Sequence, residues 1–175
     1  SKDREGAYND FSKAIEIDPS LPNGWEGRGS IRSMRGDYKG AIEDFTRAIT
    51  IRPKNERFLL KRGVNRKQIG DLDGAIADFT RVIQCSPNNS SGWSNRANAR
   101  MRKGDLNGAF EDYTKVIQLN PKILEAWNNR AHIRKSKGDL EGAIRDFTKA
   151  IELSPKFAKL YGSRAGLRVK TGDLQ

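Results

Sequence analysis

The sequence predicts an all-α solenoid, a stack of antiparallel helix pairs in which each pair packs against its neighbours. Three markers recur with a step of 34 residues along the whole chain. The dipeptide Gly-Asp begins at 36, 70, 104, 138 and 172, proline stands at 19, 53, 87, 121 and 155, and alanine at 7, 41, 75, 109 and 143. A period of this size is typical of a repeat array and not of one compact domain with a single core.

The period divides the chain into one array, 1–175, with four full repeats and an incomplete unit at each end. The full repeats are expected at 22–55, 56–89, 90–123 and 124–157. Residues 1–21 correspond to the second helix of a truncated unit, and residues 158–175 to the first helix of another. Because each helix pair needs a neighbour to bury its apolar face, stability is expected to be lowest at the two ends.

The first helix of each repeat is expected to start near the position of Pro22 and to end at a glycine such as Gly36. Glycine adopts the left-handed C-terminal conformation without steric cost. The following aspartate, Asp37 in the first full repeat, is a candidate cap for the second helix, because its carboxylate can accept a free backbone N–H group. A glycine three residues later, Gly40, costs about 1 kcal/mol inside a helix. It therefore predicts a close approach of another backbone.

The second helix carries an apolar stripe. Ile42, Phe45, Ala48 and Ile49 follow helical spacing, so they should face the first helix and the next repeat. Cys85 falls in a column that is otherwise Ile17, Ile51, Leu119 and Leu153. It is therefore expected to be a small buried apolar residue.

The sequence opens with no recognisable signal peptide and contains no apolar run long enough to span a membrane. A single cysteine excludes an internal disulfide framework and leaves the redox compartment open. We expect a cytoplasmic protein.

The motif that repeats resembles a known family. Its residues in the first full repeat are Trp25-x2-Arg28-Gly29-x2-Arg32, then Ala41-x3-Phe45 and Pro53. This pattern is similar to the tetratricopeptide repeat (TPR). The resemblance implies a right-handed solenoid of antiparallel helix pairs that serves as a scaffold for protein–protein interaction. Two departures recur, because arginine stands where the family usually has leucine and again where it usually has tyrosine.

The recurring arginines predict a structural ion network. Arg28 and Arg32 lie one turn apart on the first helix, and Asp44 lies at about the same height on its antiparallel partner. A guanidinium–carboxylate pair would explain how arginine replaces leucine. The predicted pairs are Arg28 with Asp44, Arg62 with Asp78, Arg96 with Asp112, and Arg130 with Asp146. A basic stripe that faces a ligand is the alternative interpretation.

Composition favours acidic partners without choosing among them. The chain has 33 Lys and Arg against 22 Asp and Glu, a net charge of +11. Acidic peptides, nucleic acids and anionic membranes all fit such a charge. Neither a nucleophile–base pair, nor metal-ligand spacing, nor a phosphate loop stands at a recurrent position, and His132 is the single histidine. We therefore expect a protein that is not an enzyme and that needs no cofactor or metal.

The family resemblance implies that the first helices line a concave groove, through their repeat positions 2, 5, 6, 9, 12 and 13. Amide and imidazole side chains occupy some of these positions, and an amide can pair with both the C=O and the N–H of an extended peptide. The predicted peptide-binding residues are Asn95, Asn98, Asn129 and His132, with Arg57, Lys61, Lys67, Arg102 and Lys135 for charge attraction. An unused hydrated surface is the alternative for the asparagines.

Three functions are open at this point. The first is a scaffold that binds an extended acidic peptide in the groove. The second is a single-stranded nucleic-acid-binding array, which the charge supports and the absence of aromatic residues at the groove positions opposes. The third is head-to-tail self-association, in which the incomplete units of two chains complete one repeat.

Overall fold

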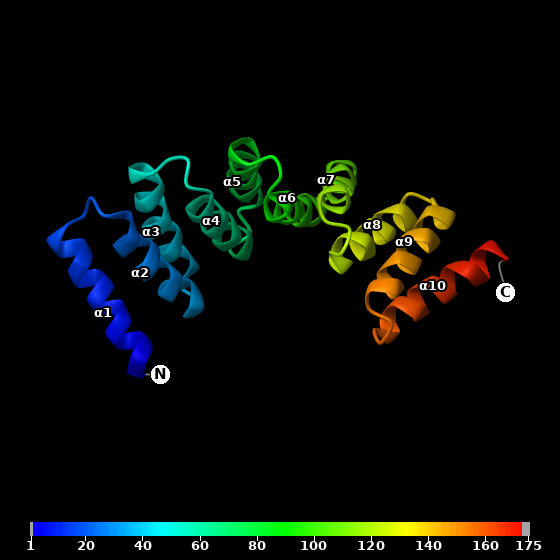
Figure 1. The fold of residues 1–175 in the computed structure, drawn as a ribbon, viewed down its shortest axis with the longest axis horizontal. Helices are drawn as coiled ribbons and strands as arrows, with labels where there is room; N and C mark the ends of the chain where they lie inside the picture. Colours follow the sequence, from blue (N-terminus) through cyan, green and yellow to red (C-terminus); the bar gives the residue numbers. More distant parts are fainter. Residues whose placement is uncertain (1, 173–175) are drawn as a thin grey trace. The chain divides into compact units, whose positions relative to one another are not determined.

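The computed structural model describes residues 2–172, which form ten α-helices in sequential antiparallel pairs (Figure 1). This confirms the predicted fold class. The chain divides into two compact units, Ser1–Ala99 and Arg100–Gln175. The first unit contains α1 (Lys2–Ile17), α2 (Pro22–Met34), α3 (Tyr38–Ile51), α4 (Glu56–Gln68), α5 (Leu72–Cys85) and most of α6 (Ser90–Lys103). The second contains α7 (Leu106–Leu119), α8 (Leu124–Ser136), α9 (Leu140–Leu153) and α10 (Ala158–Thr171).

The helices begin and end where the residue types require. Gly70, which follows α4, has a φ of +84°, a left-handed conformation that side chains with a Cβ rarely adopt. The next residue caps α5, since Asp71 Oδ1 accepts the N–H of Gly74 at 2.9 Å. The same left-handed glycine and aspartate cap stand before α3, α7 and α9.

The glycine after each cap makes the predicted close approach, but to a side chain and not to another backbone. A Cβ on Gly74 would lie 2.2 Å from Asp71 Oδ2, and one on Gly40 would lie 2.3 Å from Asp37 Oδ2. The carboxylate that caps the helix thus occupies the space of a side chain, so the cap and the glycine require one another.

The apolar stripes of the second helices α3 and α9 are buried against neighbouring helices of the same unit. In the first unit, Ala48 and Ile49 of α3 form a cluster with Phe58 and Leu59 of α4 and with Val82 of α5. In the second unit, Phe147, Ala150 and Ile151 of α9 pack with Leu160 and Leu167 of α10. Burial of one such large side chain contributes about 1.5–3 kcal/mol. Within each unit the core therefore consists of thin layers between neighbouring helices.

The expectation for Cys85 is wrong, because this side chain is exposed. Its equivalents Ile17 and Leu153 are 75% and 39% exposed. Cys85 is the last residue of α5 and lies two positions after the buried Ile83, which places it about 200° around the helix from the apolar stripe.

Candidate functional site

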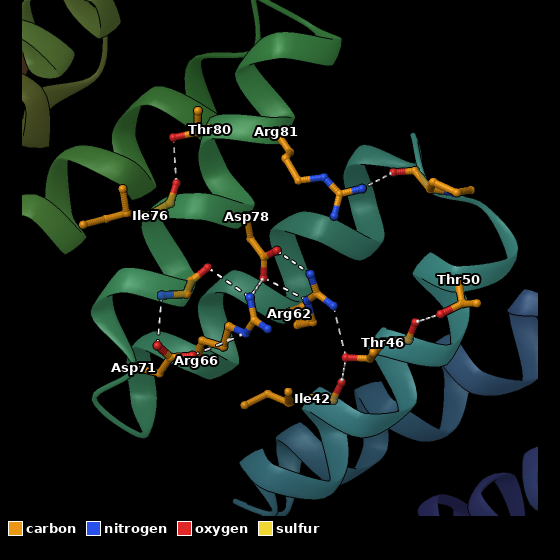
Figure 2. A network of polar contacts seen from close by, with 12 residues as sticks. Ile42, Thr46, Thr50, Arg62, Arg66, Asp71, Ile76, Asp78, Thr80 and Arg81 are labelled. Atoms are coloured by element: carbon orange, nitrogen blue, oxygen red, sulfur yellow. Dashed lines mark hydrogen bonds and ion pairs between the residues drawn. The ribbon is translucent and has the colours of Figure 1, made fainter.

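Two arginines of α4 converge on one buried carboxylate of α5 (Figure 2). Arg62 donates from Nε to Asp78 Oδ2 at 2.9 Å and from Nη2 to Oδ1 at 2.6 Å, the two-pronged geometry that suits a guanidinium and a carboxylate. Arg66 Nη1 adds a third bond to Oδ2 at 3.0 Å. The side chain of Asp78 is 1% exposed. Both charges of the pair are therefore satisfied inside the repeat.

The same arrangement recurs in other repeats. Arg28 donates to the two carboxylate oxygens of Asp44 at 3.0 and 2.7 Å, and these bonds raise the pKa of Arg28. Arg130 donates to those of Asp146 at 2.8 Å each. Asp112 accepts a bond from Arg100 at 2.9 Å within the second unit. Asp3 and Asp173 occupy the column of the cap aspartate Asp37 in the incomplete end units, and Asp173 and the side chain of Asp3 lie outside the described residues.

A further contact joins consecutive repeats and was not foreseen from the sequence. Arg62 Nη1 donates to Thr46 Oγ1 of the preceding repeat at 3.1 Å (Figure 2). The same bond links Arg96 to Thr80, Arg130 to Thr114, and Arg164 to Thr148. The threonines recur with the step of 34 residues, so their periodicity could have indicated a structural role from the sequence. The arginine columns thus link the two helices of a repeat and also link consecutive repeats within each unit.

The first helices of the first unit form the surface that we call the groove face, made by α2, α4 and α6 around Ser30, Lys61 and Asn95. Arg57 and Lys61 of α4 both donate to the carboxylate of Glu26 on α2. Glu26 is only 7% exposed. Burial favours a higher pKa for Glu26, but the hydrogen bonds from Lys61 and Arg57 outweigh it and lower the pKa. Glu26 therefore offsets part of the positive charge predicted for this surface.

Lys67 and Asn95 meet on the same face. Lys67 Nζ lies 3.4 Å from Asn95 Oδ1, and Asn95 Nδ2 donates to the Ser91 carbonyl at 3.0 Å. Asn98 lies one turn further along α6 and is half-buried. A pocket of about 490 Å³ opens between these helices. Its lining residues are Ser30, Ser33, Met34, Phe45, Leu60, Lys61, Val64, Asn65, Ser91 and Asn95.

Asn65 is a site residue that the repeat pattern did not single out. Its column is otherwise Ile31, Ala99, Ile133 and Leu167, all buried. Asn65 is 2% exposed, and its Nδ2 donates to the Lys61 carbonyl at 2.8 Å. Its Oδ1 is buried and accepts no hydrogen bond from the described residues. A polar residue in an apolar column was the available sequence signal.

The other predicted peptide-binding residues lie in the second unit, and they are Arg102, Asn129, His132 and Lys135. Asn129 donates to the hydroxyl of buried Tyr113 at 3.0 Å and accepts from Asn128 at 3.2 Å. Burial raises the pKa of Tyr113 to about 12. His132 packs edge-on against Phe147, and partial burial, with the charge of Lys135, lowers its pKa.

The amide of Asn129 is thus already engaged with the core, unlike an amide held ready for a ligand. Arg102 and Lys135 are exposed. Among residues 2–172, no three metal-ligating side chains gather, and no helix is long and apolar enough to cross a membrane.

The repeat motif and the fold agree with comparison to known proteins. Models of the tetratricopeptide repeat match residues 24–55, 90–123 and 124–157. The chain belongs to the TPR family. TPR proteins are protein–protein interaction scaffolds. No curated protein sequence gives a significant match.

Solved TPR structures share this fold at low sequence identity. The protein MamA matches with a TM-score of 0.85 and 22% identity, over 90% of this chain and 92% of MamA. YrrB, described as a TPR protein with an unusual peptide-binding site, matches with a TM-score of 0.82 and 20% identity, over 94% of this chain and 84% of YrrB. Pseudomonas aeruginosa PilF matches with a TM-score of 0.84 and 18% identity, over 98% of this chain and 78% of PilF.

Proposed function

We propose that the groove face binds an extended, acidic segment of another protein. The observation that carries the proposal is the pocket of about 490 Å³, whose wall combines apolar side chains with the amide of Asn95 and the ammonium group of Lys61. Pockets of this size that are largely apolar, with a few placed polar groups, are typical binding sites. The scaffold role of the family and the peptide-binding site of YrrB support the same function.

The chemistry of the face fits an extended backbone with acidic side chains. Asn95 offers an amide oxygen that is 3.4 Å from Lys67, so a peptide N–H or a carboxylate could exchange with this contact. Arg57 and Lys61 together outnumber Glu26 by one positive charge. With the chain at +11, acidic segments gain electrostatic attraction during encounter.

A peptide array tests the proposal. An array of extended peptides rich in Asp and Glu is probed with the wild-type chain and with Asn95→Ala and Lys67→Glu variants. We expect acidic peptides to bind, Asn95→Ala to weaken binding several-fold, and Lys67→Glu to weaken it about tenfold by charge repulsion. Binding should also fall as salt increases, because exposed charges are screened.

Lys39→Glu is the matched control, because Lys39 is an exposed lysine of α3 that does not line the pocket. It makes the same change of net charge and should leave peptide binding within about twofold. Equal losses for Lys39→Glu and Lys67→Glu would show that only net charge matters and would contradict binding at the groove face. Array binding that is indifferent to Asn95→Ala and Lys67→Glu would also count against it.

Self-association is a second candidate, favoured by a specific observation on α10. Of the described helices, α9 makes the extensive contact with α10. Part of the α10 surface remains uncovered, since Tyr161 and Val169 are 41% and 68% exposed. Arg164 occupies the column of Arg62 and donates to Thr148, while Asp10 of α1 occupies the column of Asp78 and is exposed. A second copy could therefore supply Asp10 to Arg164 and complete the pair.

Sedimentation velocity over a range of concentrations tests this candidate. Head-to-tail stacks should grow with concentration and should disappear in Arg164→Leu. Glu152→Leu is the control, since Glu152 is an exposed charged residue of α9. A strict monomer at the highest concentration would reject self-association.

A further inference from the structure

The pocket on the groove face has an unusual wall, because a buried hydrogen-bond acceptor lies among apolar side chains. Phe45, Leu60 and Val64 supply apolar surface, and Asn65 lines the same pocket. Asn65 Nδ2 donates a hydrogen bond to the Lys61 carbonyl at 2.8 Å, and this bond fixes the orientation of the amide. Its Oδ1 therefore has to find a donor, and no described residue supplies one.

A buried acceptor without a partner is costly, since it has lost its hydrogen bonds to water and gained none in return. The neighbouring repeats show that this position does not need a polar residue. Ile31, Ala99, Ile133 and Leu167 occupy the column and are at most 5% exposed. Asn65 thus introduces a destabilising group at the one position of its column that lines the pocket.

We propose that the pocket binds an aromatic side chain that carries a hydrogen-bond donor, tyrosine or tryptophan, from a bound peptide, and that Asn65 Oδ1 accepts this hydrogen bond. The peptide origin of the side chain rests on the proposed function. A pocket of about 490 Å³ has room for such a ring and for part of the adjoining backbone. Tyrosine and tryptophan combine a large apolar body with one polar group, which matches an apolar wall that holds one acceptor.

The Oδ1 atom is covered in the unliganded chain, so a side chain has to move when the ring enters. Met34 and Lys61 line the pocket, and both are long and unbranched. Met34 is 59% exposed, which leaves its thioether free to change rotamer. Lys61 Nζ bonds to Glu26 and to Ser30 Oγ, so it is the more restrained of the two. Of these two side chains, Met34 is therefore the freer to move when the ring enters.

Small aromatic probes test the inference without any peptide. The full chain is labelled on its methionine methyl groups, and p-cresol and toluene are titrated as mimics of tyrosine and phenylalanine. The chain contains two methionines, Met34 in the pocket and Met101 outside it, so Met101 is a control in the same spectrum. We expect both probes to shift the Met34 signal and to leave that of Met101 in place.

The decisive quantity is the ratio of the toluene Kd to the p-cresol Kd in the wild type and in Asn65→Leu. Leucine has nearly the shape of asparagine and occurs in this column as Leu167. We expect the ratio to fall about tenfold or more in Asn65→Leu, because the p-cresol hydroxyl would enter the pocket without a partner. The variant should also melt at a higher temperature, since it removes an unsatisfied buried oxygen. Asn65→Ala, which matches Ala99, should give the same fall and guards against misfolding of the first variant.

An unchanged ratio in both variants, or a Met34 signal that p-cresol does not shift, would overturn the inference. These outcomes are separate from the peptide array. Acidic peptides could bind with equal affinity whether they carry tyrosine, phenylalanine or alanine, and then the proposed function would stand while this inference would fall. If p-cresol binds as expected but no peptide does, the pocket chemistry stands and the peptide origin of the ring is wrong.

Discussion

Replacement of Asp78 by alanine is the most direct test of the arginine–aspartate network. The change removes a carboxylate that is 1% exposed and that accepts three hydrogen bonds from Arg62 and Arg66. Arg62, at 8% exposure, would keep its positive charge and lose its counter-charge. Loss of one partner from a buried ion pair typically costs about 3–5 kcal/mol. We expect a loss of this size in the free energy of unfolding.

Urea denaturation followed by far-UV circular dichroism measures the loss, and hydrogen exchange locates it. Faster exchange should be confined to α4, α5 and the helices that pack on them, because repeats are stabilised mainly by their neighbours. Glu43→Ala is the matched control, since it removes an exposed carboxylate from the equivalent helix of the preceding repeat. Its effect should stay within about 0.5 kcal/mol.

A third variant separates the loss of the ion-pair interaction from the cost of an unpaired buried charge. Arg62→Leu combined with Asp78→Ala removes the buried arginine together with its partner and introduces the leucine that TPR sequences usually carry. Arg66 loses its bond to Asp78 but keeps its ion pair with Asp71 at 3.4 Å. The stability of this double variant should exceed that of Asp78→Ala alone, because the penalty comes mainly from a stranded charge. If Asp78→Ala changes stability no more than Glu43→Ala does, the network contributes nothing and the reasoning is refuted.

Three further predictions concern single residues. Gly74→Ala should lower the free energy of unfolding by up to about 1 kcal/mol, because the new Cβ would displace the cap carboxylate of Asp71 at 2.2 Å and the lost cap outweighs the better helix propensity of alanine. Gly162→Ala in α10, where the new Cβ would meet no atom within 4 Å beyond its own stretch of helix, should raise it by up to about 1 kcal/mol. Chemical denaturation of both variants compares them. The raised pKa of Tyr113 means that folding favours the neutral phenol, so the free energy of unfolding should fall as pH rises from the ordinary pKa of 10 towards about 12. Denaturation curves of Tyr113→Phe should lack this part of the pH dependence. An identical pH profile in the variant would contradict the prediction. Cys85 should react fully with a thiol reagent in the native state, and labelling that requires denaturant would contradict its exposure.

The features that follow the period were predictable because their physical causes lie within one repeat. A glycine that ends a helix, the aspartate after it and the apolar stripe are local requirements, and Gly70, Asp71 and Phe79 satisfy them at fixed spacing. The proximity of Arg62 and Asp78 could also be predicted. In two antiparallel helices joined by a short turn, residues equally far from the turn lie side by side.

The features that break the period were harder to predict, because they depend on which unrepeated side chains meet between repeats. The buried Glu26 accepts hydrogen bonds from Lys61 and Arg57 of the following repeat. Two cations that were expected to attract a ligand are therefore paired with a carboxylate of the chain itself. Asn129 reaches Tyr113 of the preceding repeat because tyrosine there replaces phenylalanine. Periodicity identifies such positions as variable but does not say which neighbour each side chain contacts.

The arginine–threonine bond has a consequence for how such a chain can change its length. Arg62 and Thr46 are 16 residues apart, and the same spacing recurs for Arg96 with Thr80. Each repeat therefore carries one half of the joint on its first helix and the complementary half on its second. A tandem duplication of 56–89 would supply a matching partner on both sides of the inserted copy. Whole repeats can thus be gained or lost by recombination while this bond between repeats is kept.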